Sequence, residues 1–441
     1  MSTDLTRIGE KARKEPDLVF TTLYHHVTDL DNLRDCYETL KADKAVGVDG
    51  VTKEQYGENL EENLQNLSDR LKRMGYRPNL SRRSYIPKSG SEKGRPLGIS
   101  CLEDKIVEQA VKQVLEQIYE EIFEDSSYGY RPERSQHMCL DNLGRTIVQR
   151  RVNYLCESDI RGFFNEVSHE WMIKFLEHRI GDPRIIRLIK RMLRAGIMED
   201  GLVRASEKGT PQGSILSPLL SNIYLHYALD LWFSHRVKRQ CRGEAYYFRF
   251  ADDFLACFQY KSDADNFENR LSDRLEGFCL EVAKEKTRCI EFGRFARRAA
   301  QKRGLKPKEF TFLGFTHYCG KTRNGKFKVK RRTSRKALAR SIREFTEWAR
   351  TSRAVLRKGD MLRAAKIRIA GHMNYYAITD NSKKCSTFLY YARRILFKWL
   401  NRKSQRRSYT WKGYLQALKW AQWPRANIRK DLSPFRSYEA I

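Results

Sequence analysis

The sequence predicts an α+β fold, in which short antiparallel strands are followed by a helical, strongly basic C-terminal region. Residues 246–258 and residues 77–100 each have the pattern of two short apolar runs around a polar turn, as β-hairpins do. From about residue 330 the apolar residues instead recur at helical spacing. With 441 residues, 41% of them hydrophobic, the chain is long enough for two or three domains with their own cores.

The basic residues are concentrated in the last part of the chain. Residues 321–441 contain 33 Lys and Arg against 6 Asp and Glu, whereas residues 1–320 contain 52 against 48. Such a dense positive surface attracts a polyanion, and nucleic acid is the expected partner. The alternative, a basic surface that is merely solvated, is disfavoured because Trp and Tyr are interleaved with the cations.

Other features exclude several classes of protein. No apolar run is long enough to cross a bilayer, and the polar N-terminus is no secretory signal, so we expect no membrane partner and a cytoplasmic location. The ten cysteines, among them Cys156 and Cys257 in apolar runs, form no Cys-x-x-Cys pair and are predicted to be reduced core thiols. The nine histidines show no metal-ligand spacing, so no zinc site is expected.

The helices and strands expected between these regions follow from apolar spacing and turn residues. Val107, Val111, Val114 and Ile118 mark an amphipathic helix over residues 102–124. Gly47 to Gly50 is only a turn on its composition. Further helices are expected at 30–40, 168–197, from Ser217, at 262–280, and around 338–349, 361–369 and 389–399, and further strands at 289–292 and 310–316.

Three aspartates at the ends of apolar strands are the candidate catalytic residues. Asp252 and Asp253 occupy the turn of the 246–258 hairpin, and Asp159 lies near the end of the strand that begins at Tyr154. A simple polar turn is the alternative for the Asp-Asp pair, but its apolar flanks argue against it. Two buried like charges cost several kcal/mol unless a cation compensates them. Three carboxylates on neighbouring strands can hold two metal ions, which activate a hydroxyl and stabilise a leaving phosphate.

Phe250-Ala251-Asp252-Asp253 resembles the catalytic box of reverse transcriptases. The order of motifs along nearly the whole chain resembles the reverse transcriptase/maturase proteins encoded by bacterial group II introns. The resemblance implies a right-hand polymerase: an N-terminal extension and the start of the fingers (1–75), a fingers and palm core (76–320) and an α-helical thumb or maturase domain (321–441). Nothing in the sequence resembles the endonuclease of many members, so cleavage of a target strand is expected to come from elsewhere.

The resemblance also implies roles for individual residues. Asp159, Asp252 and Asp253 would be catalytic and, with Ile160, would bind two Mg²⁺ ions, for which Mn²⁺ can substitute. The nucleotide site would comprise Lys88, Arg95, Phe163, Phe164, Gln212 and Lys286. Phe164, five residues after Asp159, would lie under the sugar, with Phe163 on the opposite side of a strand. Plain core residues, and for Lys88 and Arg95 plain surface charges, are the alternatives.

A third set of residues is expected to contact nucleic acid. It comprises Arg82, Arg83, Arg131, Gly213, Phe312, Gly314, Arg402, Arg406, Arg407 and Trp411. Arginine together with aromatic residues can bind phosphates and stack on unpaired bases. The alternative for the 402–411 segment is a set of helix-capping cations near a core Trp. Tyr130 and Ser214 depart from the family pattern, which usually has Phe and Gly there.

The function that this resemblance implies is an RNA-directed DNA polymerase that binds its group II intron RNA and assists splicing. It would use dNTPs to copy an RNA template from a DNA primer at a DNA target site during intron mobility (retrohoming), in the bacterial cytoplasm and in contact with the nucleoid when on its target. Two alternatives remain. One is a domesticated reverse transcriptase in phage defence or repair, and the other is an RNA-binding splicing chaperone with incidental polymerase activity.

Overall fold

The computed structural model describes residues 3–86, 94–199, 201–204, 207–402 and 408–435. The chain forms two compact units that do not follow its linear order. The first unit comprises residues 1–135, 156–256 and 262–289, and the second comprises 136–155, 257–261 and 290–441. These packing units do not test the functional division into 1–75, 76–320 and 321–441, which stays a prediction.

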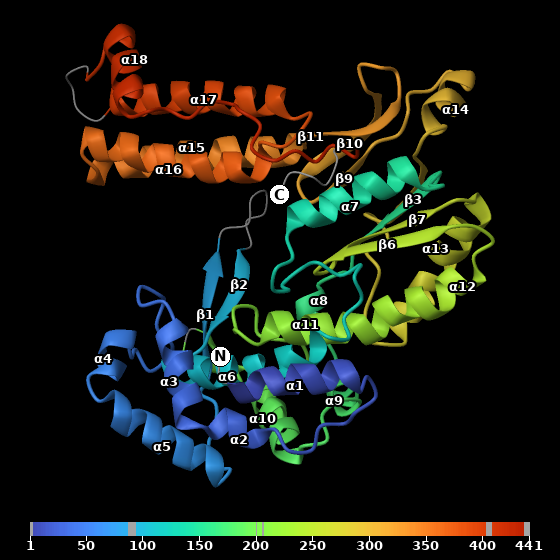
Figure 1. The fold of residues 1–441 in the computed structure, drawn as a ribbon. Helices are drawn as coiled ribbons and strands as arrows, with labels where there is room; N and C mark the ends of the chain where they lie inside the picture. The colour runs from blue at the N-terminus through green and yellow to red at the C-terminus, as the bar shows by residue number, and fades with distance from the viewer. Residues whose placement is uncertain (1–2, 87–93, 200, 205–206, 403–407, 436–441) are drawn as a thin grey trace. The chain divides into compact units, whose positions relative to one another are not determined.

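The N-terminal part of the first unit is a set of helices around one central helix. The central helix α6 (Leu102–Tyr119) buries Val107, Val111, Val114 and Ile118 completely, which confirms the predicted apolar face. Helices α1, α2 and α3 pack against it (Figure 1). The bounds of the other helices here are α1 (Thr3–Lys14), α2 (Tyr24–Thr28), α3 (Leu30–Thr39), α4 (Lys53–Gly57) and α5 (Leu60–Lys72).

A first four-stranded sheet has the order β2-β1-β4-β5. The predicted hairpin is present as β1 (Ser81–Ile86) and β2 (Arg95–Ile99), which pair antiparallel. Strand β4 (Ile197–Glu199) pairs with β1 in parallel and with β5 (Leu202–Arg204) antiparallel. The antiparallel hairpin was predicted, whereas the parallel pairing with β4 was not, because β4 comes from a distant part of the chain.

A second four-stranded sheet, with the order β6-β7-β3-β8, carries the candidate catalytic residues (Figure 1). Strands β6 (Ala245–Phe250) and β7 (Asp253–Phe258) are the predicted aromatic hairpin, and the five residues from Phe254 to Phe258 are buried. The bounds of the other strands are β3 (Tyr154–Ser158) and β8 (Arg288–Glu291). The helices that accompany them are α8 (Phe163–Glu166), α9 (His169–Glu177), α10 (Pro183–Arg194), α11 (Ser217–Leu225), two π-helical turns (His226–Asp230 and Phe233–Val237), α12 (Lys238–Gln240) and α13 (Lys261–Glu276).

The second unit combines a three-stranded sheet, in the order β11-β10-β9, with long helices. Helices α15 (Arg335–Val355), α16 (Lys358–Tyr376) and α17 (Ser382–Leu400) pack on one another and confirm the three predicted helices, although α16 is longer than expected. Helices α7 (Gln136–Gln149) and α18 (Trp411–Trp420) were not predicted. The other bounds are α14 (Ala296–Lys302), β9 (Phe310–Phe312), β10 (Phe315–Lys321) and β11 (Phe327–Thr333).

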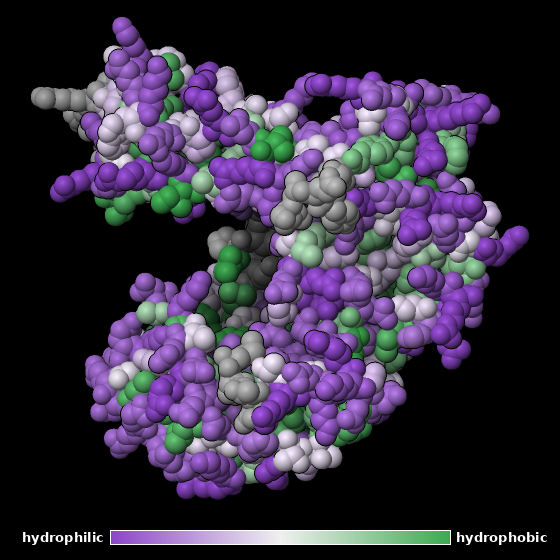
Figure 2. All heavy atoms as spheres, viewed as in Figure 1, coloured by the Kyte–Doolittle hydropathy of each residue, from purple (hydrophilic) through white to green (hydrophobic). Residues whose placement is uncertain are grey.

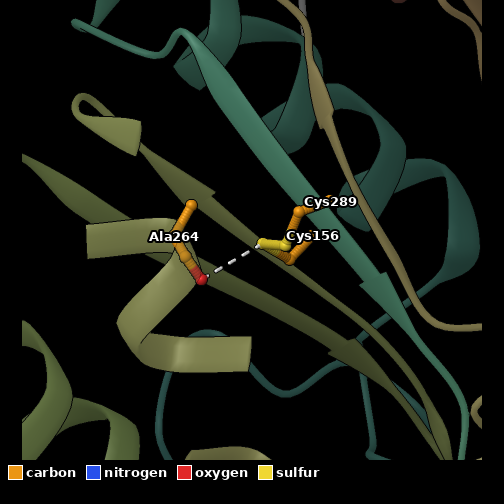
Figure 3. The surroundings of a disulfide bond; sticks show 3 residues. All are labelled: Cys156, Ala264 and Cys289. Carbon is orange, nitrogen blue, oxygen red and sulfur yellow. Dashed lines mark hydrogen bonds between the residues drawn. A yellow bond between two sulfur atoms is a disulfide. The ribbon is translucent and has the colours of Figure 1, made fainter. Parts of the chain in front are cut away.

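Two of the cysteines are not reduced as predicted. Cys156 on β3 and Cys289 on β8 form a disulfide, with their Cα atoms 4.0 Å apart (Figure 3). The two residues are 133 positions apart in the chain, so only the adjacency of β3 and β8 brings them together. The other eight cysteines have free thiols, and most of these are buried, as expected for core residues.

Hydrophilic residues cover most of the face of the molecule seen in Figure 2, with hydrophobic residues scattered among them. Within the ranges that the structure describes, we find no helix with the length and apolar character needed to cross a bilayer.

Candidate active site

The turn of the β6–β7 hairpin is held in an uncommon backbone conformation. Ala251 has a φ of 58°, in the left-handed region that residues other than glycine rarely adopt. Gly129 lies directly against this turn, and a Cβ atom at position 129 would be 2.3 Å from the backbone nitrogen of Ala251. Only glycine fits this approach, so the 126–130 segment and the turn fix each other's position.

That segment also pairs with the outer edge of the sheet. The backbone nitrogen of Arg249 donates to the carbonyl of Ser126 (2.8 Å), and the nitrogen of Tyr128 donates to the carbonyl of Arg249 (2.9 Å). Because β6 is the last strand of its sheet, these bonds satisfy backbone groups that would otherwise be an open edge.

The side chain of Arg249 is the centre of a buried network beneath the hairpin. Its guanidinium is fully buried and donates to both carboxylate oxygens of Asp230, at 2.7 and 2.5 Å. It also donates to Asn222 Oδ1 (2.9 Å) and to the carbonyl of Ala251 (3.1 Å). Burial alone would lower the pKa of Arg249, but the charge and hydrogen bonds of Asp230 outweigh it and the pKa is raised. Arg249 therefore stays charged, and its hydrogen bond to the carbonyl of Ala251 helps to fix the turn.

Sequence reasoning missed this network. Asn222 completes it by donating from Nδ2 to the carbonyl of Gly129 (2.7 Å), so that one side chain links the turn and the segment that packs against it. The signal in the sequence was an arginine inside an apolar strand, Tyr246 to Phe250, where a charge needs a buried partner. Its partner Asp230 lies 19 residues earlier, at the end of a π-helical turn, and no local pattern identifies it.

Of the three predicted aspartates, Asp253 interacts electrostatically with the other two. Asp159 directly follows β3, the strand beside β7; Asp253 is the first residue of β7, and Asp252 lies in the turn before it. The pKa of Asp253 is raised to about 6, first by desolvation and then by the negative charges of Asp252 and Asp159. Asp253 is therefore close enough to Asp252 and Asp159 to respond to their charges.

Lys286 is a counter-charge to one of these carboxylates. Its ammonium group forms an ion pair with Asp159 Oδ2, and this contact raises the pKa of Lys286. The predicted role of Lys286 in binding the nucleotide stays a prediction. The lysine is 63% exposed, so the pair itself adds little stability.

The donor set fits a divalent cation in its chemistry. Carboxylate oxygens are the ligands that Mg²⁺ prefers. The pKa of Asp253 is raised first by desolvation and then by the negative charges of Asp252 and Asp159, and a bound cation would offset those charges. Ile160 and Val282 are opposite each other in an isolated β-bridge. The hydrogen bonds of this bridge use the carbonyl of Asp159 and the nitrogen of Arg161, so the carbonyl of Ile160 takes no part in it. In the part of the chain that the structure describes, no three His, Cys, Asp or Glu side chains are close enough together to form a metal cluster.

Phe163 and Phe164 lie on a helix and not on a strand. Gly162 adopts a left-handed conformation (φ 57°) and starts α8, so the expectation that the two rings face opposite sides of a strand was wrong. Phe163 is buried and packs against Tyr224, whereas Phe164 is only half-buried.

The Pro-Gln-Gly loop joins α8 to β2. The backbone nitrogen of Thr210 donates to the carbonyl of Phe164 (2.8 Å), and that of Gly98 donates to the carbonyl of Gln212 (2.7 Å). Gly213 has a φ of 120°, and a Cβ there would lie 2.6 Å from the Gly98 carbonyl oxygen. The loop therefore carries Gln212 between two of the segments predicted to contact nucleotide. Two further predicted positions, Lys88 and the side chain of Arg95, lie outside the described residues.

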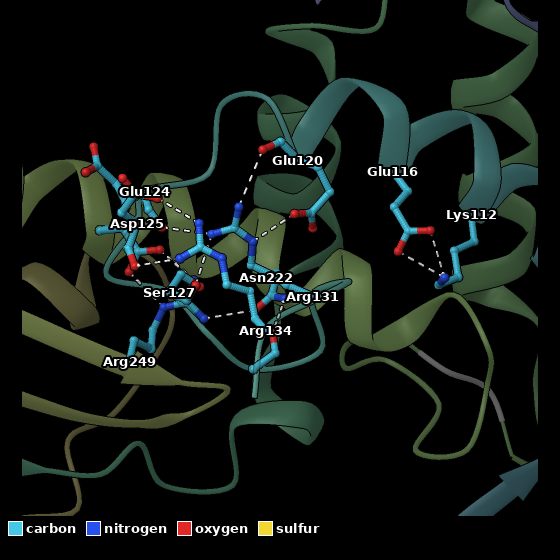
Figure 4. A network of polar contacts seen from close by, with 12 residues as sticks. Lys112, Glu116, Glu120, Glu124, Asp125, Ser127, Arg131, Arg134, Asn222 and Arg249 are labelled. Atoms are coloured by element: carbon cyan, nitrogen blue, oxygen red, sulfur yellow. Dashed lines mark hydrogen bonds and ion pairs between the residues drawn. The ribbon is translucent and has the colours of Figure 1, made fainter. Parts of the chain in front are cut away.

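Two of the arginines predicted to contact nucleic acid bind the protein itself. Arg131 is buried, donates to Glu120 Oε2 at 2.9 Å and to the carbonyls of Glu124 and Ser127, and lies in the polar network of Figure 4. This placement argues against the predicted contact, because the guanidinium is already bound to groups of its own unit. Arg82 donates twice to the carbonyl of Val46, at 3.1 and 2.9 Å. Arg83 is half-buried.

The predicted nucleic-acid residues of the second unit differ in exposure. Phe312 is buried, and Gly314 (φ 77°) forms the turn between β9 and β10. Trp411 is 39% exposed and packs edge-on against Phe397. Arg402 is exposed and lies over the ring of Trp399. Arg406 and Arg407 lie outside the described residues.

Comparison with known proteins agrees with this geometry. A family model described as "Reverse transcriptase (RNA-dependent DNA polymerase)" matches residues 86–317, which include all three aspartates. The chain is similar to the group II intron-encoded protein LtrA of Lactococcus lactis subsp. cremoris, with 38% identity over 222 residues, 50% of this chain and 37% of LtrA. It is also similar to protein YkfC of Escherichia coli K12, with 34% identity over 280 residues, 56% of this chain and 73% of YkfC.

A more distant relative is an uncharacterized 91 kDa protein in the cob intron of Schizosaccharomyces pombe, with 32% identity over 224 residues, 50% of this chain and 27% of that protein. The chain thus spans well under two thirds of LtrA and of the yeast protein, and a larger share of YkfC.

Proposed function

The chain belongs to the reverse transcriptase (RNA-dependent DNA polymerase) family, and from this premise we propose that it is an RNA-directed DNA polymerase that acts with a group II intron RNA. The observation that carries the polymerase proposal is the electrostatic coupling of Asp253 to Asp252 and Asp159 across neighbouring strands. The similarity to LtrA, whose name describes a group II intron-encoded protein, supports the choice of RNA partner.

In this proposal Asp159, Asp252 and Asp253, with the carbonyl of Ile160, hold two Mg²⁺ ions, and Mn²⁺ can replace them. When bound, these ions supply acidity to the primer hydroxyl and charge to the leaving pyrophosphate. Lys286 supplies a positive charge beside Asp159. Lys88 and Arg95 neutralise the phosphates of the incoming dNTP.

The residues around the Pro-Gln-Gly loop position the nucleotide. Phe164 lies under the sugar, where a bulky ring disfavours a 2′-hydroxyl, and Gln212 contacts the nucleotide from a loop bonded to both α8 and β2. Phe163 acts from the core by packing behind this site.

The second unit supplies most of the RNA-binding surface. Its excess of Lys and Arg, with exposed Trp411 and Arg402 near the end of α17, supports binding of intron RNA and assistance with splicing. By the same proposal the protein makes cDNA by target-primed reverse transcription at a DNA site. It then works in the bacterial cytoplasm and contacts the nucleoid when bound to its target.

Primer extension on an RNA template annealed to a DNA primer tests the polymerase. Asp252→Asn removes a carboxylate that is itself a proposed metal ligand. Loss of a residue that only hydrogen-bonds to such a ligand typically reduces activity by about 10- to 100-fold, so this variant should reduce dNTP incorporation by more than that. Asp273→Asn, which removes an exposed carboxylate elsewhere in the same unit, is the matched control and should retain activity. Equal incorporation by the wild type and Asp252→Asn would refute the polymerase proposal and leave the splicing-chaperone alternative.

Sequencing the RNA that co-purifies with the protein tests the partner. Enrichment of one intron is expected, and its loss when the 402–411 basic residues are neutralised would assign binding to that segment. A random mixture of cellular RNAs would favour a domesticated enzyme instead.

A further inference from the structure

The second unit contains a cavity of about 860 Å³ that the polymerase proposal does not use. It is bounded by the end of α7, by α14 and the turn before it, and by the tip of the β10–β11 hairpin. Its volume lies within the range of roughly 300–1,000 Å³ typical of ligand sites. The insertion at residues 294–308, which precedes β9 and includes α14, contains 7 Lys and Arg in 15 residues.

Among the residues that the structure describes, five cations line this cavity and no acidic residue does so. They are Arg294, Arg297, Arg298, Lys321 and Lys326. All five are exposed, and none takes part in an ion pair with any described residue. Arg294 donates only to a backbone carbonyl, that of Val148, at 3.1 Å. Positive charges gathered without counter-ions repel one another, and an anionic ligand would relieve that repulsion.

Three cations close to the cavity in the chain are paired with carboxylates. Arg303, one residue beyond α14, pairs with Glu291; Lys328 on β11 pairs with Asp380 at 2.9 Å, and Arg332 on β11 pairs with Glu309 at 2.6 Å. The five cations that line the cavity have no such carboxylate partner among the described residues. Their convergence on one cavity together with two aromatic rings indicates a site for a ligand.

Aromatic side chains in the lining narrow the class of ligand. Phe327 is half-buried, and Phe435 is 48% exposed, so each offers part of a ring to the cavity. A small anion such as phosphate needs only the cations. Bases of an unpaired strand need aromatic faces as well, and the combination of cations that follow a backbone with rings that stack on bases is typical of single-strand binding.

We propose that this cavity binds a short segment of single-stranded nucleic acid, with its phosphates on the five cations and a base stacked on Phe327 or Phe435. The site is distinct from the three aspartates, which lie in the first unit, and from the 402–411 segment. Either RNA or single-stranded DNA has the required chemistry, so the test includes both.

The test uses the full chain and fluorescein-labelled oligouridylate or oligothymidylate, with affinity measured by fluorescence anisotropy over a range of salt concentrations. The variant Arg297→Gln/Arg298→Gln removes two cavity cations. Its matched control, Lys302→Gln/Lys306→Gln, removes two exposed cations of the same insertion that do not line the cavity. Each lost phosphate contact should reduce the slope of log affinity against log salt by about 0.7.

We expect the cavity variant to reduce that slope by about 1.4 relative to the control. Phe435→Ala should weaken binding by roughly 5- to 150-fold, the range for loss of one base stack, and should leave the slope unchanged. The oligonucleotide that loses more affinity identifies the strand as RNA or DNA. Crosslinking of a 4-thiouridine oligonucleotide to the peptide around Phe327 would place the strand in the cavity.

Two results would overturn the proposal. If the cavity variant behaves like its control, the five cations do not bind a strand. If charge removal weakens binding but Phe435→Ala and Phe327→Ala do not, the cavity takes a polyphosphate and no base. Primer extension on a pre-annealed template should be unchanged in all these variants, so failure here is separable from failure of the polymerase proposal.

Discussion

Among the described residues, each of the two compact units buries one arginine completely, and the two arginines are compensated differently. Arg249 in the first unit is paired with the carboxylate of Asp230, and its pKa is raised. Arg331 in the second unit donates to the carbonyls of Leu140 (2.5 Å) and Leu432 (3.2 Å), and no ion pair among the described residues includes it. Burial lowers the pKa of Arg331 to about 10, although Asp141 and Asp380 offset part of that shift.

This difference shows what each unit needs from a buried charge. In the first unit the charges of Arg249 and Asp230 compensate each other, so this pair holds the Ala251 turn without leaving an unpaired buried charge. The guanidinium in the second unit serves as a multiple donor that joins α7 to the segment near Leu432, and its charge is only partly compensated. Removing a partner should therefore affect the two units very differently.

The largest effect is expected from Asp230→Asn, which leaves Arg249 charged and unpaired in the core. We expect a loss of about 3–5 kcal/mol in unfolding free energy, as for other broken buried pairs. Urea denaturation gives the total, and hydrogen exchange read by mass spectrometry should show the loss in β6 peptides before α16 peptides. In the double variant Asp230→Leu/Arg249→Met most of the stability should return without the polymerase activity. A double variant as unstable as Asp230→Asn would argue against unpaired charge as the cause.

Lowering the pH should show whether the two units lose their folding stability together. Burial, the largest cause, lowers the pKa of His226 in the first unit from 6.5 to about 4, and burial does the same to His372 in the second. A depressed histidine pKa contributes stability that is complete above pH 6.5 and is lost as the pH falls toward 4. For His226 this amounts to roughly 3 kcal/mol. His226→Phe should remove that part of the acid response from first-unit peptides in hydrogen exchange at pH 7 and pH 4.5. An unchanged pH dependence would contradict it.

Gly129 lies against the Ala251 turn and Gly144 lies against Arg331, and the two positions should differ in how well they tolerate alanine. A Cβ at position 129 meets the backbone of Ala251 at 2.3 Å, whereas a Cβ at position 144 meets the Nη2 atom of Arg331 at 2.0 Å. Backbone cannot move aside as a side-chain end can, so Gly129→Ala should cost about 3 kcal/mol and Gly144→Ala nearer 1 kcal/mol. Thermal unfolding of both variants measures this order, and the reverse order would contradict it.

The smallest effect is expected from Arg331→Met. It leaves two buried carbonyls with one donor fewer each, but it also removes an incompletely compensated charge, so the net cost should be about 1 kcal/mol. Arg249→Met, its counterpart in the first unit, should cost several times more because Asp230 is then buried without a partner. Similar losses in the two variants, measured by urea denaturation, would remove the distinction between the units.

The sequence predicted those parts of the site that are encoded locally. The hairpin around Asp252 and the helical run after residue 330 follow from apolar spacing within short windows, and both are present. The helix that starts at Gly162 was missed because a glycine after a strand was taken as part of that strand. Arg131 was assigned to nucleic acid from the resemblance of its motif, and the buried acceptors that bind it lie up to 11 residues away.

The long-range parts could not be predicted from spacing. Asp230 and Arg249, Cys156 and Cys289, and helix α7 with the second unit each depend on which segments become neighbours in the fold. A pattern within one segment carries no information on that choice, whereas the pairing of buried opposite charges becomes evident once the fold is known.

The complete enclosure of the Arg249–Asp230 pair bears on how the protein can be handled. Dissolved ions weaken only those attractions that water can reach, and at 1 M salt the screening length is about 3 Å. Exposed cations such as Arg297 should then release bound nucleic acid, while the sealed pair keeps the aspartate turn in place. Concentrated salt is therefore expected to strip the purified protein of its nucleic acid without erasing its catalytic geometry.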